Sequence, residues 1–371
     1  MRRVGVLALV ALLAATSCGA PTPDPGPEPD GPALPRVAGA WEALPPSPLD
    51  ARGGSRVTWT GTEVVVSGGE TFVDETLPPC PGGASCAGPE PTYHPDAAAW
   101  EPATRTWRTT PPDTGLPAVP GTVRVIEPGR WVDGRFVAAG WSDETTKTVA
   151  VVVFDPSTGA WSIDEWPFPD PYQQELVSVW TGTELLVVAR ALGEGCEAGG
   201  TCRVVASWAP AAQWTSGTWR RVAEWPVDAS TDGPGRGEQF SALVQAGGRT
   251  LGVGRVWDVE AGVEVVRLDP ADGSTEPLPT LDQPAGDALQ LDGAYAVGDD
   301  LVVGTGRVFA VLGADDVWRE LPPVPGIVPS AARAVVSTGE ELFVWGGTGS
   351  PMVPGTEDED RGWTFAPPPP P

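Results

Sequence analysis

The side chains in this 371-residue sequence that are best suited to chemistry are arginines and carboxylates. Arginine presents a planar fork of donors that can bind a carboxylate at two points. Six charged residues, each near the start of a short apolar segment, are therefore candidates for binding a polar or anionic ligand: Arg52, Arg124, Glu175, Arg236, Glu238 and Arg333. The alternative interpretation is that these charges face solvent or satisfy backbone groups.

Signals for catalysis are mostly absent. His94 is the only histidine, so a Ser-His-Asp triad or a His-rich metal centre would have to be built around one residue. The sequence has no Gly-x-Ser-x-Gly elbow, phosphate-binding loop or dinucleotide fingerprint. We therefore predict no catalytic residue, no metal and no cofactor, and we interpret His94 as a loop residue without chemistry.

An acidic run, Glu357-Asp358-Glu359-Asp360, is the one local cluster of carboxylates. Such runs are usually solvated. Calcium binding is the alternative, although the run lacks the ligand alternation and the glycine of an EF-hand loop.

Four cysteines form two pairs with the same spacing, Cys80 with Cys86 and Cys196 with Cys202. Each pair brackets a glycine-containing loop. Equal spacing in equivalent places predicts two local disulfides, which form in oxidising compartments. A metal site would need all four thiolates to converge from two distant loops.

The first residues are typical of an export signal, with Arg2 and Arg3 ahead of an apolar run that is too short to span a membrane. The segment before Cys18 resembles a bacterial lipobox, in which the cysteine is acylated. We predict a lipoprotein signal peptide over 1–17, a Pro-rich acidic tether over 18–39, and one folded domain over 40–371. The expected location is the outer face of the bacterial cytoplasmic membrane, with the lipid anchor as the only membrane contact.

The formal net charge is −26, with 49 acidic and 23 basic residues. This balance disfavours nucleic acid as a partner.

The elements that must position these residues are β-hairpins. Six segments show an apolar strand, a tight turn with glycine and a second apolar strand; they are 57–66, 131–137, 177–187, 245–251, 296–302 and 334–344. A second recurring signal is a turn followed by a tryptophan that opens the last strand of a repeat, as in Phe154 to Trp161. We expect the tryptophans of this second signal to pack between neighbouring repeats: Trp41, Trp107, Trp161, Trp219 and Trp318. Trp59 and Trp180 lie on the first strand of a hairpin, and we expect them in the core between repeats.

The second strand of a hairpin ends twice in a glycine pair, at Gly68-Gly69 and Gly346-Gly347. A glycine pair after an apolar strand, with a tryptophan in the fourth strand, resembles the kelch repeat, and the period of about 50 residues agrees. The resemblance implies an all-β, six-bladed β-propeller of degenerate kelch-like repeats. We expect its blades near 55–110, 122–166, 175–226, 239–280, 287–323 and 331–366.

The last blade lacks an outer strand, because only prolines follow residue 366. The segment around Trp41 reads like an outer strand without its own blade. We therefore expect this N-terminal strand to close the ring by pairing with the third strand of the sixth blade.

The long insertions all fall on one face of the expected propeller, over 70–96, 190–203 and 347–361, and the turns on the other face are tight. Elaborated loops on a rigid scaffold are common binding surfaces. The sequence therefore predicts a binding module that recognises a cell-envelope protein or glycan. A metal-independent sugar-acting enzyme, similar to the mutarotases among kelch-like propellers, and a passive scaffold are the alternatives. The copper chemistry of galactose oxidase is excluded because it needs paired histidines.

Overall fold

The computed structural model describes residues 34–72, 91–110, 124–125, 129–142, 148–168, 173–196, 202–227, 240–255, 262–282, 291–305, 308–325, 333–347 and 360–367. The chain separates into two units, Met1–Ala33 and Leu34–Pro371. All described residues belong to the second unit. They form strands and connections, and none of them belongs to a helix long and apolar enough to cross a membrane.

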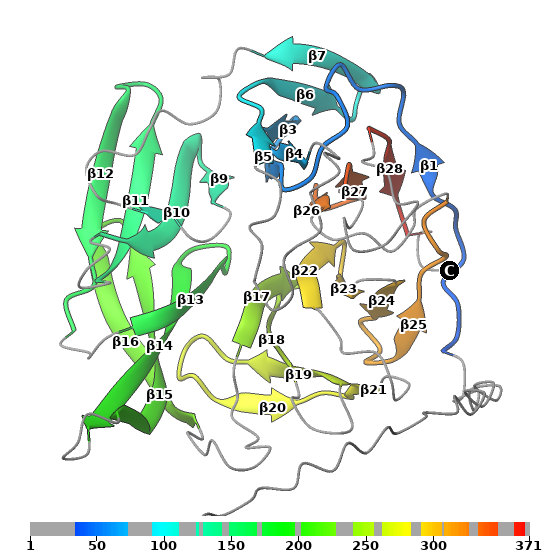
Figure 1. The fold of residues 1–371 in the computed structure, drawn as a ribbon. Coiled ribbons are helices and arrows are strands. Elements are labelled where there is room, and N and C mark those ends of the chain that lie inside the picture. Colours follow the sequence, from blue (N-terminus) through cyan, green and yellow to red (C-terminus); the bar gives the residue numbers. More distant parts are fainter. Residues whose placement is uncertain are drawn as a thin grey trace, which may run out of the picture. The chain divides into compact units, whose positions relative to one another are not determined.

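The described strands pair into six antiparallel sheets that form the blades of a propeller (Figure 1). Within each blade the strands are named from the innermost outward. Blade 1 contains β2 (Arg56–Trp59), β3 (Val64–Ser67), β6 (Ala97–Glu101) and β7 (Thr106–Thr110). In blade 2 the inner position is shared by β8 (Arg124–Val125) and β9 (Arg130–Val132), followed by β10 (Arg135–Trp141), β11 (Val149–Asp155) and β12 (Ala160–Glu165). Blade 3 contains β13 (Gln173–Trp180), β14 (Leu185–Cys196), β15 (Cys202–Thr215) and β16 (Thr218–Val227).

The remaining three blades repeat this order. Blade 4 contains β17 (Phe240–Ala246), β18 (Arg249–Arg255) and β19 (Gly262–Leu268), and its outer position is shared by β20 (Thr275–Pro277) and β21 (Leu281–Asp282). Blade 5 contains β22 (Leu291–Val297), β23 (Asp300–Thr305), β24 (Val308–Leu312) and β25 (Trp318–Glu320). Blade 6 contains β26 (Ala334–Ser337), β27 (Leu342–Trp345), β28 (Gly362–Phe365) and β1 (Glu42–Ala43). A separate hairpin, β4 (Glu70–Phe72) with β5 (Pro91–Tyr93), extends blade 1.

The protein is a six-bladed β-propeller. All six predicted hairpins are present as the first two strands of a blade, and the blade limits agree with those expected. The segment Phe154 to Trp161 is the turn between the third and outer strands of blade 2. The kelch-like character of the repeats stays a prediction.

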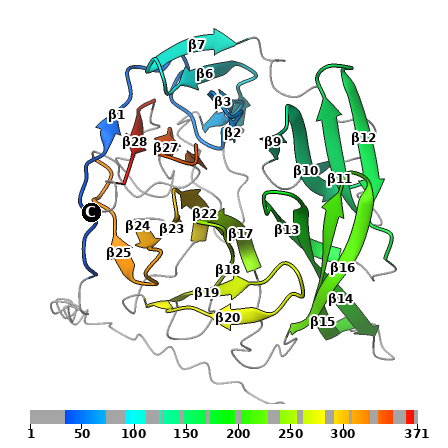
Figure 2. The same ribbon diagram turned by 180° about the vertical axis from the view of Figure 1, so that it is seen from behind.

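The ring is closed by the N-terminal strand, as the sequence predicted. Glu42 pairs with Thr364 and Ala43 with Trp363, so β1 supplies the outer strand of blade 6 (Figure 2). The ring of Trp41 lies 5.6 Å from that of Phe309 in blade 5 and 5.3 Å from that of Phe365 in blade 6. This pairing covers the free edge of β28 and joins the two ends of the propeller.

Residues 34–39, which the sequence assigns to the tether, run beside blade 5. The Val37 amide donates to the Glu320 carbonyl at 2.9 Å, and the Glu320 amide donates to the Pro35 carbonyl at 2.9 Å. The compact unit therefore begins at Leu34.

The hydrophobic core lies between neighbouring blades. One cluster joins blades 2 and 3, and others join blades 3 and 4, 4 and 5, 5 and 6, and 6 and 1. A strand in the middle of a blade is covered on both faces, which explains why residues 149–154 form an uninterrupted apolar run in which every residue is buried.

A recurring hydrogen bond fastens three successive blade junctions. The indole nitrogen of Trp318 donates to the Pro279 carbonyl at 2.7 Å, that of Trp41 to Pro322 at 2.6 Å and that of Trp107 to Pro45 at 3.1 Å. In each case the tryptophan opens the outer strand of one blade and the proline follows the outer strand of the preceding blade. We call this contact the indole clasp.

Candidate functional site

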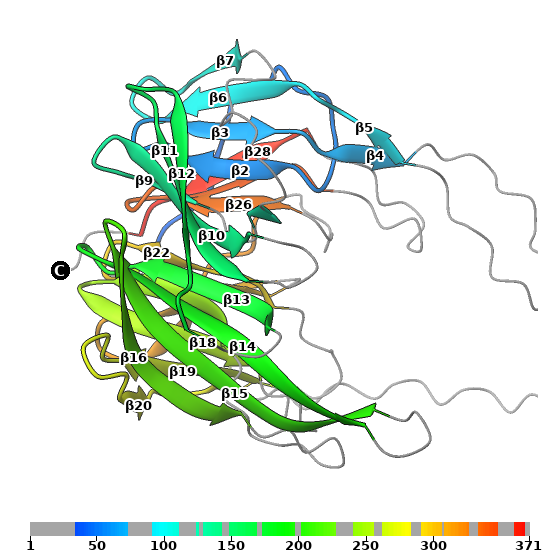
Figure 3. The same cartoon turned by 90° about the vertical axis from the view of Figure 1, so that its left-hand side faces the viewer.

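The loop-rich face of the propeller carries two hairpin extensions. Strand direction alternates within a blade, so the second strand of each blade ends, and the third begins, on this face. In blade 1 this connection begins with the β4–β5 hairpin, and in blade 3 it is formed by β14 and β15, which are 12 and 14 residues long. Figure 3 shows both extensions projecting from the same side of the ring. We call this side the hairpin face.

Arg52 is placed where blade 1 meets blade 6 on the hairpin face. Its side chain is fully buried, and its guanidinium forms two hydrogen bonds with the Asp96 carboxylate, one from Nη2 to Oδ2 at 3.1 Å and one from Nη1 to Oδ1. Its Nε donates to the Asp50 carbonyl at 2.9 Å. Its own carbonyl accepts the Gly347 amide of blade 6 at 3.2 Å. Arg52 thus ties three chain segments together.

The glycine pair of blade 1 makes room for this arginine. Gly69 has a φ of +106°, and a Cβ atom there would lie 2.9 Å from Cδ of Arg52 and 2.5 Å from Oγ of Ser55. Only glycine meets both requirements. The Gly346-Gly347 pair of blade 6 also has positive φ values.

The electrostatics of the Arg52 site favour an ionised carboxylate. The hydrogen bond from Arg52 lowers the pKa of Asp96 below its ordinary value, and this effect outweighs the opposing effect of burial. The described hydrogen bonds of the Arg52 side chain all go to the protein itself, namely to the Asp96 carboxylate and to the Asp50 and Gly68 carbonyls.

The other candidate residues are described only in part. Arg333 is half-buried directly before β26. Arg124 pairs with Trp141 through the β8 backbone, and Glu175 pairs with Arg190 through the β13 backbone. The side chains of Arg124 and Glu175 lie outside the described residues, as do Arg236 and Glu238 altogether. A ligand-binding role for these residues stays a prediction.

Of the cysteines, the second pair has a described backbone. Cys196 lies opposite Cys202 at the end of the β14–β15 hairpin. Cys18, Cys80 and Cys86 lie outside the described residues, and so does the acidic run 357–360 except for Asp360, which is exposed. The described part of the chain contains no group of three or more His, Cys, Asp or Glu residues arranged to hold a metal ion.

Comparisons with known proteins give a fold likeness and no family. No protein-family model matches the sequence, and no curated protein matches it significantly. The chain is similar to a solved structure described as "Structure of YjhT", with a TM-score of 0.47 and 12% sequence identity over 86% of this chain and 95% of that chain. We draw no functional inference from this likeness, and the fold rests on the strand pairing.

Sequence reasoning missed Asp96 as the partner of Arg52. The two residues are 44 positions apart, and Asp96 is the last residue of the long insertion 70–96, in which no carboxylate stood out. His94 lies nearby, with its Nε2 3.0 Å from Oγ1 of Thr71 and its amide donating to the Gly69 carbonyl. These contacts brace the base of the β4–β5 hairpin.

Proposed function

We propose that this protein is an exported, lipid-anchored binding module that uses the hairpin face to hold a protein or glycan of the cell envelope. The observation that carries the proposal is the pair of hairpin extensions on one face of a closed ring. In the described structure hydrophobic clusters join five pairs of neighbouring blades, and packed scaffolds that carry long connections on one side are common binding surfaces.

The cysteine spacing supports the same role. Cys196 and Cys202 are opposite one another where the β14–β15 hairpin ends, and Cys80 and Cys86 lie in the segment that connects β4 with β5. A disulfide across each tip would lower the conformational freedom of the loop and so the entropic cost of binding. These disulfides belong to the proposal.

The anchor completes the proposal. Acylation of Cys18 would attach the chain to the membrane, and the Pro-rich segment that follows would hold the propeller away from the lipid surface. The net charge of −26 makes an anionic partner unfavourable and favours a neutral or basic one.

The test is binding of the full propeller, with Cys18 replaced by serine for solubility, to purified peptidoglycan and to envelope proteins in a pull-down. In the test variant the β14–β15 hairpin is shortened at the Gly193–Ala206 pair and closed with Asn-Gly. We expect this variant to keep its melting temperature and to lose binding by on the order of tenfold or more.

The matched control is Thr62→Ala, an exposed position in the tight β2–β3 turn on the opposite face. It should bind like the wild type. Equal binding by the shortened variant and the wild type, with both folded, would refute the role of the hairpin face. For the anchor, Cys18→Ser should move the protein from the membrane to the soluble fraction of cells.

A further inference from the structure

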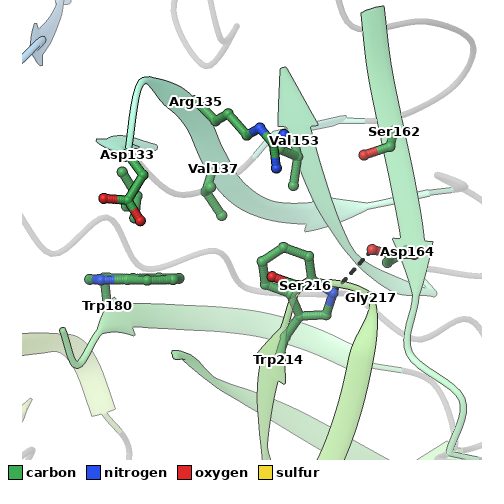
Figure 4. Close-up of a pocket in the computed structure, with 11 residues that line it drawn as sticks. Asp133, Arg135, Val137, Val153, Ser162, Asp164, Trp180, Trp214, Ser216 and Gly217 are labelled. Atoms are coloured by element: carbon green, nitrogen blue, oxygen red, sulfur yellow. Dashed lines mark hydrogen bonds between the residues drawn. The ribbon is translucent and has the colours of Figure 1, made fainter. Parts of the chain in front are cut away.

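A pocket of about 300 Å³ lies between blades 2 and 3, on the face opposite the hairpin face. Its walls come from the β9–β10 turn, from β11 and β12, and from the ends of β13 and β15 (Figure 4). The volume is at the lower end of the range for small-molecule sites. The sequence had assigned only tight turns to this face.

Two turns of fixed geometry frame the pocket mouth. Asp133-Gly134 joins β9 to β10 and Ser216-Gly217 joins β15 to β16, and all four residues have positive φ values between 46° and 88°. Two-residue loops with this conformation are type I′ turns, whose twist matches that of the flanking strands. Asp133 and Ser216 are therefore held at defined positions, and both are exposed to solvent.

Two tryptophans supply the apolar surface of the pocket. Trp180 is half-buried at the end of β13, and Figure 4 shows its ring edge-on, with one face turned toward the space below Asp133. Trp214 is buried, and its indole nitrogen donates to Oδ2 of Asp164 at 3.1 Å. This bond links blade 3 to blade 2 and fixes the Trp214 ring as a wall. Trp180 thus offers the open aromatic platform.

The polar groups at the pocket include both donors and acceptors. Arg135 is held by a bond from its Nε to Oδ2 of Asp155 at 3.2 Å, and its terminal amino groups have no partner among the described residues. Asp133 and Asp164 present acceptor oxygens, and Ser216 presents a hydroxyl that can donate or accept. Figure 4 shows the Arg135 guanidinium beside Val153, on the Trp214 side of the pocket and across it from Trp180.

We propose that this pocket binds one pyranose ring of an uncharged glycan. A sugar ring has an apolar face of C–H groups that packs on an indole, and an edge of hydroxyl groups that need both donors and acceptors. The Trp180 platform and the set of Arg135, Asp133 and Ser216 supply these two surfaces. An organic cation fits less well, because Arg135 repels it and only one aromatic face is open.

The site does not depend on the hairpin face, because its residues belong to the opposite side of the ring. If the hairpin face binds no partner, the sugar-binding proposal is unaffected. If the pocket binds no sugar, the proposal for the hairpin face is unaffected. The protein with the shortened β14–β15 hairpin is expected to keep its affinity for the sugar.

The experiment uses the soluble full propeller on an array of uncharged oligosaccharides, followed by isothermal titration with the strongest hit. Trp180→Ala should weaken binding by on the order of tenfold or more, because it removes the aromatic anchor. The matched control is Trp59→Ala, since Trp59 ends β2 of blade 1 and is also followed by Thr-Gly-Thr-Glu. It should leave the affinity unchanged.

A second variant tests the proposal independently if Trp180→Ala does not fold. Ser162 is an exposed residue at the pocket on β12, so Ser162→Trp should fill the pocket without disturbing the core and should abolish binding. Arg135→Ala should also weaken sugar binding. The proposal is overturned if no array sugar binds, if Ser162→Trp binds like the wild type, or if tetramethylammonium binds more tightly than the sugar.

Discussion

Two blade junctions, 5–6 and 2–3, are built from the same repeat. They differ in the contact that the tryptophan of the outer strand makes with the preceding blade. At the first, Trp41 donates its indole proton to Pro322, which completes an indole clasp. At the second, Trp219 occupies the equivalent position, but its ring packs on Trp166 with the centroids 5.1 Å apart, and its indole nitrogen has no partner in the described structure. The second junction is also the one that holds the pocket.

The outer strands explain this difference. Blade 5 reads Trp318-Arg319-Glu320-Leu321-Pro322, whereas the longer outer strand of blade 2 ends at Glu165 and is followed by Trp166-Pro167. In the clasp a leucine, Leu321, precedes the proline. In blade 2 the larger Trp166 takes that position, and its ring lies against Trp219 of the next blade. A small change in one outer strand is enough to replace a hydrogen-bonded junction with an aromatic one.

The largest expected effect on stability concerns the junction between blades 6 and 1, where Arg52 contacts both blades. Asp96→Asn leaves the buried Arg52 charge without a counter-ion and should lower the free energy of unfolding by about 2 kcal/mol, between the values for exposed and buried pairs because the Asp96 side chain is 50% exposed. Chemical denaturation at neutral pH measures this loss.

The pH dependence of the same variant has a defined sign. The pKa of Asp96 is lowered in the folded state, so its stabilisation is full at neutral pH and is lost as the pH falls below the ordinary value of 3.8 and through the lowered one. The difference between wild type and Asp96→Asn should therefore shrink in acid. A difference that stays constant down to low pH would contradict the ion pair.

The comparison between the junctions is tested directly by removing an indole nitrogen from each. Trp41→Phe leaves the Pro322 carbonyl without its donor and should cost about 1–2 kcal/mol. Trp219→Phe removes a buried donor that has no partner in the described structure, so about 0 kcal/mol is expected from its hydrogen bonding. Urea denaturation of the two variants side by side gives both values. Equal losses would mean that the clasp does not distinguish the junctions.

The smallest expected effect on stability comes from alanine substitutions at two glycine turns, one packed against the next blade and one open beside the pocket. Gly247 and Gly134 both have positive φ, so alanine strains the backbone at either position. A Cβ at Gly247 would lie 3.0 to 3.2 Å from Asp299 of blade 5, whereas none of the described atoms lies within 4 Å at Gly134 beside the pocket. Gly247→Ala should be the more destabilising by about 1 kcal/mol in thermal unfolding.

The fold could be predicted because its signals are local. A hairpin such as 177–187 carries its apolar strands and its glycine turn within a few residues, and the likeness between the Trp41 and Trp318 segments revealed the closing strand. Local patterns repeated six times give the number of blades. The pairing of β1 with β28 could then be predicted because the sixth blade lacked an outer strand of its own.

The site could be predicted only in part because its contacts join distant segments. Nothing near Arg52 indicates that Asp96 will meet it, and nothing near Trp180 indicates that Asp133 and Trp214 will share its pocket. Trp180 was expected in the core between blades. It does pack against that core, but one face is turned to the pocket.

The closing pair joins two strands that lie far apart in the sequence. Among the described strands, β1 comes first and its partner β28 comes last. Every chain that stops short of residue 362 keeps the edge of blade 6 unpaired, together with an unmatched β1. Unpaired strand edges promote aggregation, so a chain truncated before residue 362 is expected to aggregate more readily than the full propeller.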